Sequence, residues 1–354
     1  MALKAMNLRL LKPSRIKEIT QLFTSRISTG RSSKHMTERS SLAVISVLHT
    51  PRKNSSSHTS KASLLILPAF RTTFFHGATV VLLMLLAHWG FAQAHEVHVI
   101  PETQDYSTAL ELATEHNAFL LVSIEFHGKE KRDGVRNHLS KETTRTLFHK
   151  SMHKWVFCFL TMEDATTLIT NPSLREMRQG PGVFVVDCTT GPLSGRIISI
   201  LPKTPGKYYR FMPFHIDELA NLPSGTLTQR SMILAVRIHP ERPQSTASEC
   251  HTYLCQKAAS HSAYQANILK QGHHNWGPRS QDIVHKTGHI GQASEICAQS
   301  WENQDLLDSC VDCVASWRHS SGHWQAVHSK QIAYGYDIRR GTNGIWYATG
   351  IFLD

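Results

Sequence analysis

Three polar residues in the last third of this 354-residue chain could share one chemical task. They are His273, Glu295 and His323, and they lie at the ends of segments with helix or strand patterns. Neutral imidazole and ionised carboxylate are both metal ligands and proton acceptors near neutral pH. If the fold brings the three side chains into one cleft, that cleft can hold a divalent metal ion, Zn²⁺ or Mg²⁺, or transfer protons.

Three neighbouring residues are assigned to the same predicted binding cleft. His274 directly follows the first histidine and is the alternative to it, and Ser320 and Trp324 flank His323. The candidate catalytic group is Glu295, because it is the one carboxylate in the set. The opposing interpretation is that the imidazoles and the carboxylate only hydrogen-bond to one another and brace the groove.

Helical patterns on both sides must position these groups. Residues 247–270 carry an apolar stripe at steps of three and four residues, and His261 on that stripe is expected to be a hydrogen-bonded core residue. We expect Gly272 to end this helix, since glycine is the usual stop, and to place the first histidine at the mouth of the cleft. A second helix at 306–317 is expected to break at Gly322 and to present the other histidine just beyond.

The order of these features resembles the CAP superfamily, which comprises cysteine-rich secretory, antigen 5 and pathogenesis-related proteins with an SCP-like domain. The resemblance covers residues 246–354. It rests on Gln265 eight residues before the histidine, on the later glutamate, and on Trp317 leading into Ser-x-Gly-His. Two closing segments rich in aromatic and β-branched residues, 332–338 and 345–352, read as the last strands. The resemblance implies a three-layer α-β-α sandwich.

The resemblance also implies a function. CAP domains have a groove associated with lipid, sterol, glycan or protein ligands, with divalent metal in some members and no general catalytic activity. Animal and plant relatives carry a second glutamate where this chain has Ser320, so metal affinity is expected to be lower and more dependent on pH. We favour a binding module over the alternative, a metal-dependent hydrolase in which Glu295 activates a water, because no H-E-x-x-H helix is present.

The preceding block, residues 95–201, alternates helix and strand patterns and resembles the thioredoxin-like fold. Its apolar runs are typical of strands buried on both faces: 119–126, 155–160, 182–187 and 197–201. Pro181 stands before the third run, where that family has a proline. The segment 127–134, where the family's redox pair belongs, contains no cysteine. Thiol–disulfide exchange needs an attacking thiolate, so we expect a scaffold or binding module here rather than an oxidoreductase.

The remaining elements of this half are expected as follows. Helices are predicted at 109–117 and at 140–153, the second capped by Ser140. Residues 202–245 contain six prolines and little periodicity, which indicates a connector between two domains. The middle of this connector, 232–238, is apolar enough to be a strand added to one of the sheets. The whole chain is therefore predicted to be α/β.

The N-terminal part indicates export. Residues 1–70 are rich in Ser, Thr and basic residues, and we expect a disordered extension or residues upstream of the true start codon. Residues 71–94 combine a positive flank, a short apolar core and an Ala-Gln-Ala site, the layout of a signal peptide cleaved after Ala94. The alternative is an uncleaved membrane anchor at about 72–94, although a span needs roughly 20 apolar residues. A secreted, extracellular or periplasmic protein is expected.

The net charge of +11 does not indicate a nucleic-acid partner. Residues 1–71 hold 13 Lys and Arg but only Glu18 and Glu38, and this surplus of 11 equals the charge of the whole chain. Residues 72–354 are therefore neutral by count. Without a basic surface to neutralise phosphates, nucleic-acid binding has no physical basis. The expected partner is an extracellular or envelope lipid, glycan or protein.

Seven cysteines would meet an oxidising environment after export, where disulfides can form. The odd number leaves at least one unpaired. Candidates for disulfides are the five in the last third: Cys250, Cys255, Cys297, Cys310 and Cys313. The last two have C-x-x-C spacing, yet they lie on the apolar stripe of one predicted helix. We favour packing, or a bridge from one of them to Cys297, over a metal site.

Overall fold

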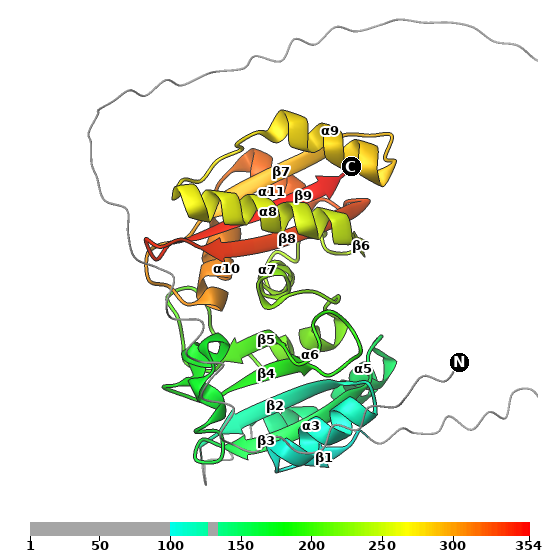
Figure 1. Cartoon of the computed structure of the whole chain (residues 1–354), viewed down its shortest axis with the longest axis vertical. Helices are drawn as coiled ribbons and strands as arrows, with labels where there is room; N and C mark the ends of the chain where they lie inside the picture. The colour runs from blue at the N-terminus through cyan, green and yellow to red at the C-terminus, as the bar shows by residue number, and fades with distance from the viewer. Residues whose placement is uncertain (1–99, 127–133) are drawn as a thin grey trace, which may run out of the picture. The chain divides into compact units, whose positions relative to one another are not determined.

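The computed structural model describes residues 100–126 and 134–354, which belong to one compact unit of the chain. The predicted N-terminal extension, the predicted signal peptide and nearly all of the cysteine-free segment 127–134 lie outside these residues. Within the described part, no helix has the length and apolarity that crossing a membrane requires. The fold is mixed α/β, as predicted, with helices packed on two mixed sheets (Figure 1).

The first sheet has the strand order β1-β3-β2-β4-β5. Its strands are β1 (Glu102–Thr103), β2 (Phe119–Glu125), β3 (Trp155–Thr161), β4 (Gly182–Asp187) and β5 (Ile197–Pro202). Strands β1, β3 and β2 are parallel, whereas β4 and β5 are antiparallel to their neighbours. All the longer strands are almost completely buried, which explains why they read as continuous apolar runs in the sequence.

The helices of this half are mostly short. They are α3 (Tyr106–Glu115), α4 (Val135–Leu139), α5 (Glu142–Lys150), η2 (Leu168–Thr170), η3 (Pro172–Met177) and α6 (Phe214–Asn221). The predicted helix at 140–153 with Ser140 as its cap is wrong in its start. Ser140 ends α4, with its hydroxyl donating to the carbonyl of Arg136, and Lys141 precedes α5. Two short helices replace one because the serine bonds backward rather than forward.

The segment 232–238, predicted as a strand, is part of helix α7 (Leu227–Arg237). Thr226 and Gln229 form a capping box at its start, a local signal for a helix that the strand prediction missed. From Gln229 to Val236 every residue is buried, so the helix shows no polar face and its apolar run resembles a buried strand. The expected connector 202–245 is thus a layer of packed helices, because α7 contacts both β5 and β8.

The second sheet has the order β6-β8-β9-β7. Its strands are β6 (Glu249–Cys250), β7 (Ala293–Gln299), β8 (Ala333–Arg340) and β9 (Trp346–Leu353). Its helices are α8 (Thr252–Ile268), α9 (Trp276–Thr287), α10 (Leu306–Arg318) and α11 (Ser321–His328). Strands β8 and β9 form the antiparallel hairpin that the sequence predicts, and β7 pairs antiparallel with β9.

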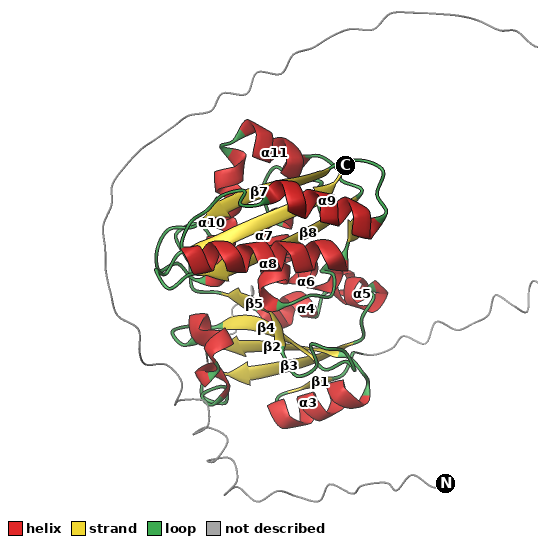
Figure 2. Ribbon diagram, turned by 45° about the horizontal axis from the view of Figure 1, so that its top comes forward, coloured by secondary structure: helices red, strands yellow, loops and turns green. Residues whose placement is uncertain are grey.

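Alternating side chains divide this sheet into two packed faces. Ala333 and Ile351 pack with Leu254 of α8 and Ile283 of α9. Strand residues that point to the opposite face, such as Tyr336, belong to the core cluster that includes α10 and α7. Helix α8 runs along β8 and β9 in both views (Figure 1 and Figure 2). Glu295 of β7 is paired with Ile351 of β9. Its side chain therefore lies on the same face of the sheet, toward α8 and α9.

Three further expectations about the second sheet need correction. Helix α8 ends with Leu269 in the left-handed conformation at φ 55°, before the expected stop at Gly272. Gly322 does not break a helix: α10 ends at Arg318, and Gly322 lies in the first turn of α11. All seven cysteines lie in the described part of the chain and are free. The expected bridge from Cys310 or Cys313 to Cys297 of β7 is therefore not formed.

Helix α8 approaches β8 most closely at Gly335. A β-carbon at this position would overlap backbone atoms of Leu254 and Cys255. We expect Gly335→Ala to lower the free energy of unfolding by about 1–3 kcal/mol, because the helix must move away from the sheet. The matched control is Gly277→Ala in the first turn of α9, where a β-carbon meets nothing within 4 Å. Urea unfolding of both variants checks this, and equal stabilities would contradict it.

Glu176 connects the first half of the unit to α10. Its Oε1 accepts a hydrogen bond of 2.6 Å from the backbone N–H of Leu306 at the start of that helix. Its Oε2 is buried and has no hydrogen-bond partner among the described residues. Burial raises the pKa of the Glu176 carboxyl to about 7. The folded state therefore favours the protonated acid, and the penalty for folding grows as the pH rises from about 4.5, the ordinary value, through 7.

Glu176→Gln keeps a carbonyl oxygen for the Leu306 N–H and removes the buried charge. We expect this variant to be more stable than wild type by about 1–2 kcal/mol at pH 8. The advantage should shrink toward pH 4.5, where the wild-type acid is protonated in the folded state and about half protonated in the unfolded state. Urea unfolding at the two pH values measures the difference. A variant that is less stable at pH 8 would show that the charge itself holds α10.

Candidate functional site

Glu295 is the centre of the predicted site and lies in the middle of β7. Its side chain has no exposed surface. A carboxylate taken out of water in this way costs several kcal/mol unless it is paired and hydrogen-bonded. Both oxygens must therefore find donors on the α8 and α9 face of the sheet.

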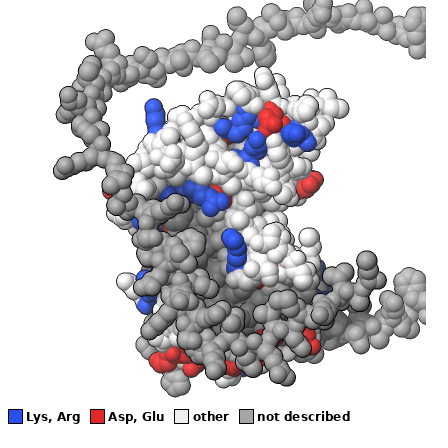
Figure 3. All heavy atoms as spheres, viewed as in Figure 1, with Lys and Arg blue, Asp and Glu red and all other residues white. Residues whose placement is uncertain are grey.

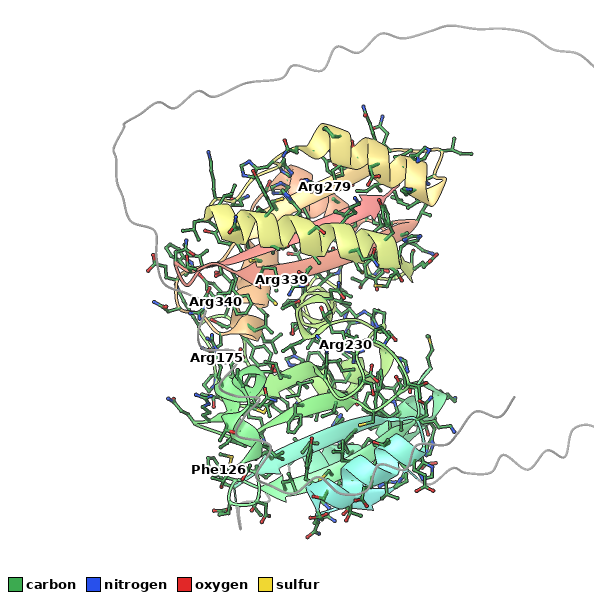
Figure 4. The ribbon with its side chains drawn as sticks, viewed as in Figure 1. Phe126, Arg175, Arg230, Arg279, Arg339 and Arg340 are labelled. Carbon is green, nitrogen blue, oxygen red and sulfur yellow. The ribbon has the colours of Figure 1, made fainter. Side chains whose placement is uncertain are left out.

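Arg279 of α9 supplies the charge. Its Nη2 and Nε lie 2.6 and 3.0 Å from Oε2 of Glu295, and its Nη1 donates to the carbonyl of His274 at 2.8 Å. Figure 4 shows Arg279 between α9 and the strands. The guanidinium thus ties helix, strand and the preceding loop together. Sequence reasoning missed this residue, although Trp276, Arg279 and Ile283 step by three and four along one face of α9.

His273 lies against the other oxygen of the carboxylate. Its Nδ1 is 3.1 Å from Oε1 of Glu295, and its side chain is 44% exposed. A carboxylate acceptor places the proton of a neutral imidazole on Nδ1 and leaves the lone pair on Nε2. The Sγ of Cys297 lies 3.8 Å from the same Nδ1. Glu295 therefore orients an imidazole that has access to solvent.

The loop that carries His273 is held by α8. Gln265 accepts a 3.0 Å hydrogen bond from the N–H of Gly272 and donates at 3.0 Å to the hydroxyl of Thr349 on β9. His261, one turn earlier, has its Nε2 2.9 Å from the carbonyl of Gly272. Both residues are buried, so one face of α8 fixes the start of the loop. This agrees with the expectation that His261 is a hydrogen-bonded core residue.

His323 comes from α11 and faces the first histidine. The ring centroids of His273 and His323 are 5.9 Å apart at an angle of 45°. Burial, followed by the nearby His273, lowers the pKa of His323 below its ordinary value. The imidazole is therefore neutral at pH 7 and has a lone pair to offer. The structure thus brings His273, Glu295 and His323 together, with His323 inside the first turn of α11.

The other predicted site residues do not join this group. The ring of His274 packs against Tyr264 and His261 instead, and its buried Nε2 has no hydrogen-bond partner among the described residues. Ser320 precedes α11, and its side chain makes no capping hydrogen bond. The ring of Trp324 contacts His239 and His328 and lies under the guanidinium of Arg318. His274 and Trp324 thus pack against rings outside the group of His273, Glu295 and His323.

A second possible metal group overlaps the first. Ligand atoms of His261, Glu295 and Cys297 lie within 4.8 Å of one another, so these buried residues could hold a metal ion. Its donor chemistry is unfavourable, however. The Nε2 of His261 must carry a proton to bond the Gly272 carbonyl, and burial raises the pKa of the Cys297 thiol. Arg279 already neutralises the carboxylate.

The three site residues line none of the four cavities described in residues 100–126 and 134–354. The largest, of about 680 Å³, lies along the ends of α6 and α7. His273 is exposed and His323 is half-buried, and both lie in front of the buried ion pair of Glu295 and Arg279.

Removing the guanidinium would leave Glu295 buried without a counter-charge. We expect Arg279→Met to lower the free energy of unfolding by about 3–5 kcal/mol. The double variant Arg279→Met/Glu295→Gln should recover much of this loss, because no charge then remains buried. Urea unfolding at pH 7 provides the measurement, with exposed Arg196→Met as the control that changes little. An Arg279→Met protein as stable as the control would rule out this account of the ion pair.

Comparisons with known proteins do not assign this chain to a family. No protein-family model matches it, and a search of curated proteins finds no match either. The residues and their geometry are therefore the basis for any function. What they offer is one imidazole oriented by a buried, charge-neutralised carboxylate and a second imidazole that faces the first.

Proposed function

We propose that the chain is an exported binding module in which a CAP-like domain follows a thioredoxin-like scaffold. The observation that carries this proposal is the pair His273 and His323 in front of the buried Glu295–Arg279 ion pair. The order of helix, histidine, glutamate strand, Trp317 helix and closing hairpin supports the CAP resemblance. Helices on both faces of the second sheet are what an α-β-α sandwich requires.

The first sheet supports a thioredoxin-like scaffold without redox activity. Its parallel β1-β3-β2 set followed by antiparallel β4 and β5 suits that fold, and Pro181 stands directly before β4. The cysteines of this half, Cys158 and Cys188, are buried, which raises the pKa of their thiols to about 12 and about 11. Thiols that stay protonated at neutral pH do not attack disulfides.

The two histidines would hold a divalent metal ion, with zinc preferred for its affinity for imidazole nitrogen. Glu295 accepts from Nδ1 of His273, which leaves Nε2 as the ligand atom. The carboxylate thus orients a ligand and does not itself bind metal. When bound, the metal would give the surface an open coordination position for an oxygen or nitrogen of a partner. Magnesium suits this donor set poorly because it prefers oxygen ligands.

The alternative of a metal-dependent hydrolase is less well supported. It needs Glu295 to take a proton from a water molecule. The Oε2 of that residue is occupied by Arg279 and Oε1 by His273, and its side chain has no exposed surface. A water has no access to either oxygen. We therefore favour the binding module over the hydrolase.

The proposed partner is an extracellular or envelope lipid, glycan or protein rather than nucleic acid. On the face seen in Figure 3, blue and red side chains of the described residues are scattered among uncharged ones and form no continuous basic surface. Export itself is proposed from the signal-peptide pattern at 71–94.

Zinc titration of the metal-free, purified chain tests the site. We expect one ion per chain at pH 7.5 by calorimetry, and a loss of affinity of about tenfold or more in His273→Ala and in His323→Ala. Binding should weaken as the pH falls below about 6, because both imidazoles must be neutral. The lowered pKa of His323 keeps this ring available to a lower pH than an ordinary histidine.

His285→Ala is the matched control, since His285 is exposed on α9. It should bind zinc like wild type. Cys297→Ser distinguishes the two candidate groups, because only the buried group uses that thiol. If zinc binding survives in both histidine variants and disappears in Cys297→Ser, the ion belongs to the buried group and the proposal is wrong. Absence of zinc binding in wild type would also overturn it.

A further inference from the structure

Two cysteine sulfurs lie in contact at the edge of the second sheet. Cys250 ends β6 and Cys255 stands in the first turn of α8, and their Sγ atoms are 3.4 Å apart. Cys250 is half-buried, whereas Cys255 is only 7% exposed. Cys250 is therefore the more exposed residue of the two, and the sulfur of the more buried residue lies beside it.

A rigid frame holds the pair together. Cys250 is paired with Tyr334 of β8, and the N–H of the next residue, His251, donates to the Tyr334 carbonyl at 2.9 Å. Cys255 is fixed where α8 meets Gly335, and its carbonyl accepts from Gln229 of α7 at 3.3 Å. The closeness of the sulfurs is thus set by sheet register and helix packing.

The surroundings shift the pKa values of the two thiols in opposite directions. The thiol of Cys255, then the hydroxyl of Tyr334 and the charge of Arg237, lower the pKa of Cys250 against the effect of burial. The same contact and burial raise the pKa of Cys255. Burial also raises the pKa of the other five cysteines, so among the described thiols Cys250 is the one with a lowered value. Such an asymmetry gives one attacking and one resolving sulfur.

We propose that Cys250 and Cys255 are a reactive dithiol that reduces a small disulfide and closes into a bridge between β6 and α8. The Cys250 thiolate attacks one sulfur of a disulfide R–S–S–R, forming a mixed disulfide and releasing RS⁻. RS⁻ takes the proton of the Cys255 thiol. The Cys255 thiolate then attacks the Cys250 sulfur and releases the second RS⁻, which is protonated by water. Two protein thiols are oxidised and one small disulfide is reduced to two thiols.

This site is separate from the histidine pair and does not depend on the proposed binding function. The redox chemistry expected for a thioredoxin-like domain is lacking in the first sheet, whose two buried thiols have raised pKa values. The two cysteines of the proposed dithiol lie instead in β6 of the second sheet and in α8, five positions apart in the sequence.

Glutathione disulfide added to the fully reduced chain tests the proposal. Intact-mass spectrometry should show loss of two hydrogen atoms, and peptide mapping should place the bridge between Cys250 and Cys255. The Cys255→Ser variant should stop at the mixed disulfide and gain one glutathione on Cys250. The Cys250→Ser variant should react at least about tenfold more slowly, because the remaining sulfur is buried and protonated. Cys188→Ser, in the first sheet, should bridge like wild type.

Several outcomes would overturn the proposal. The wild-type chain could stay reduced, the bridge could map to another pair, or Cys250→Ser could take up glutathione as fast as Cys255→Ser. Circular dichroism spectra and melting temperatures close to wild type show that the serine variants are folded. If a serine variant does not fold, the mapping of the wild-type bridge and the Cys250→Ala variant decide the question.

Discussion

The buried pairing of Glu295 with Arg279 is the constraint on which the site depends. Isolating a carboxylate in the packed face of a sheet costs several kcal/mol, and one guanidinium at 2.6 Å offsets this only because its second and third nitrogens are also used. One of them bonds the same carboxylate oxygen, and another bonds the carbonyl of His274. The pair therefore fixes the position of α9 and the loop before it. The remaining carboxylate oxygen is then left to orient an imidazole.

The ion pair of Glu295 and Arg279 affects the neighbouring imidazole of His273 without adding a net charge beside it. The net charge of the buried pair is zero, so the exposed imidazole sits beside a neutral unit and not beside a free anion. The carboxylate still selects which nitrogen of His273 carries the proton, since Nδ1 faces it at 3.1 Å. The same geometry makes Glu295 an unsuitable general base. In our proposal Glu295, the candidate catalytic group of the sequence, has a positioning role instead.

Some of this was accessible from the sequence and some was not. The hairpin of β8 and β9 follows from its aromatic and β-branched residues, whereas the shared location of His273, Glu295 and His323 was expected from the resemblance of their order to the CAP superfamily. Arg279 was missed, because a helical spacing of Trp276, Arg279 and Ile283 does not show which buried group the arginine will meet, and the fold places it against Glu295. Periodicity also gives no guide where all sides of an element are covered.

Helix α7 is the clearest case of that limit. Its residues from 229 to 236 are all buried because the helix packs against α10 and against strands of both sheets. Even its charged member, Arg230, is completely covered, and its guanidinium donates to the hydroxyl of Ser199 and to backbone carbonyls that include that of Leu222. Burial lowers the pKa of Arg230 to about 9, which leaves it protonated at neutral pH. A connector with such a residue cannot act as a flexible linker.

The same packing determines how the histidine pair and the dithiol can influence each other. Both are attached to α8: Cys255 is in its first turn, and Gln265 near its end holds the loop of His273. The two residues are ten positions apart, which corresponds to about 15 Å of helix. A change at one end could reach the other only if the helix moved as a body, and its close contact with Gly335 opposes such movement. The two proposed sites are therefore both attached to α8, one near each end of the helix.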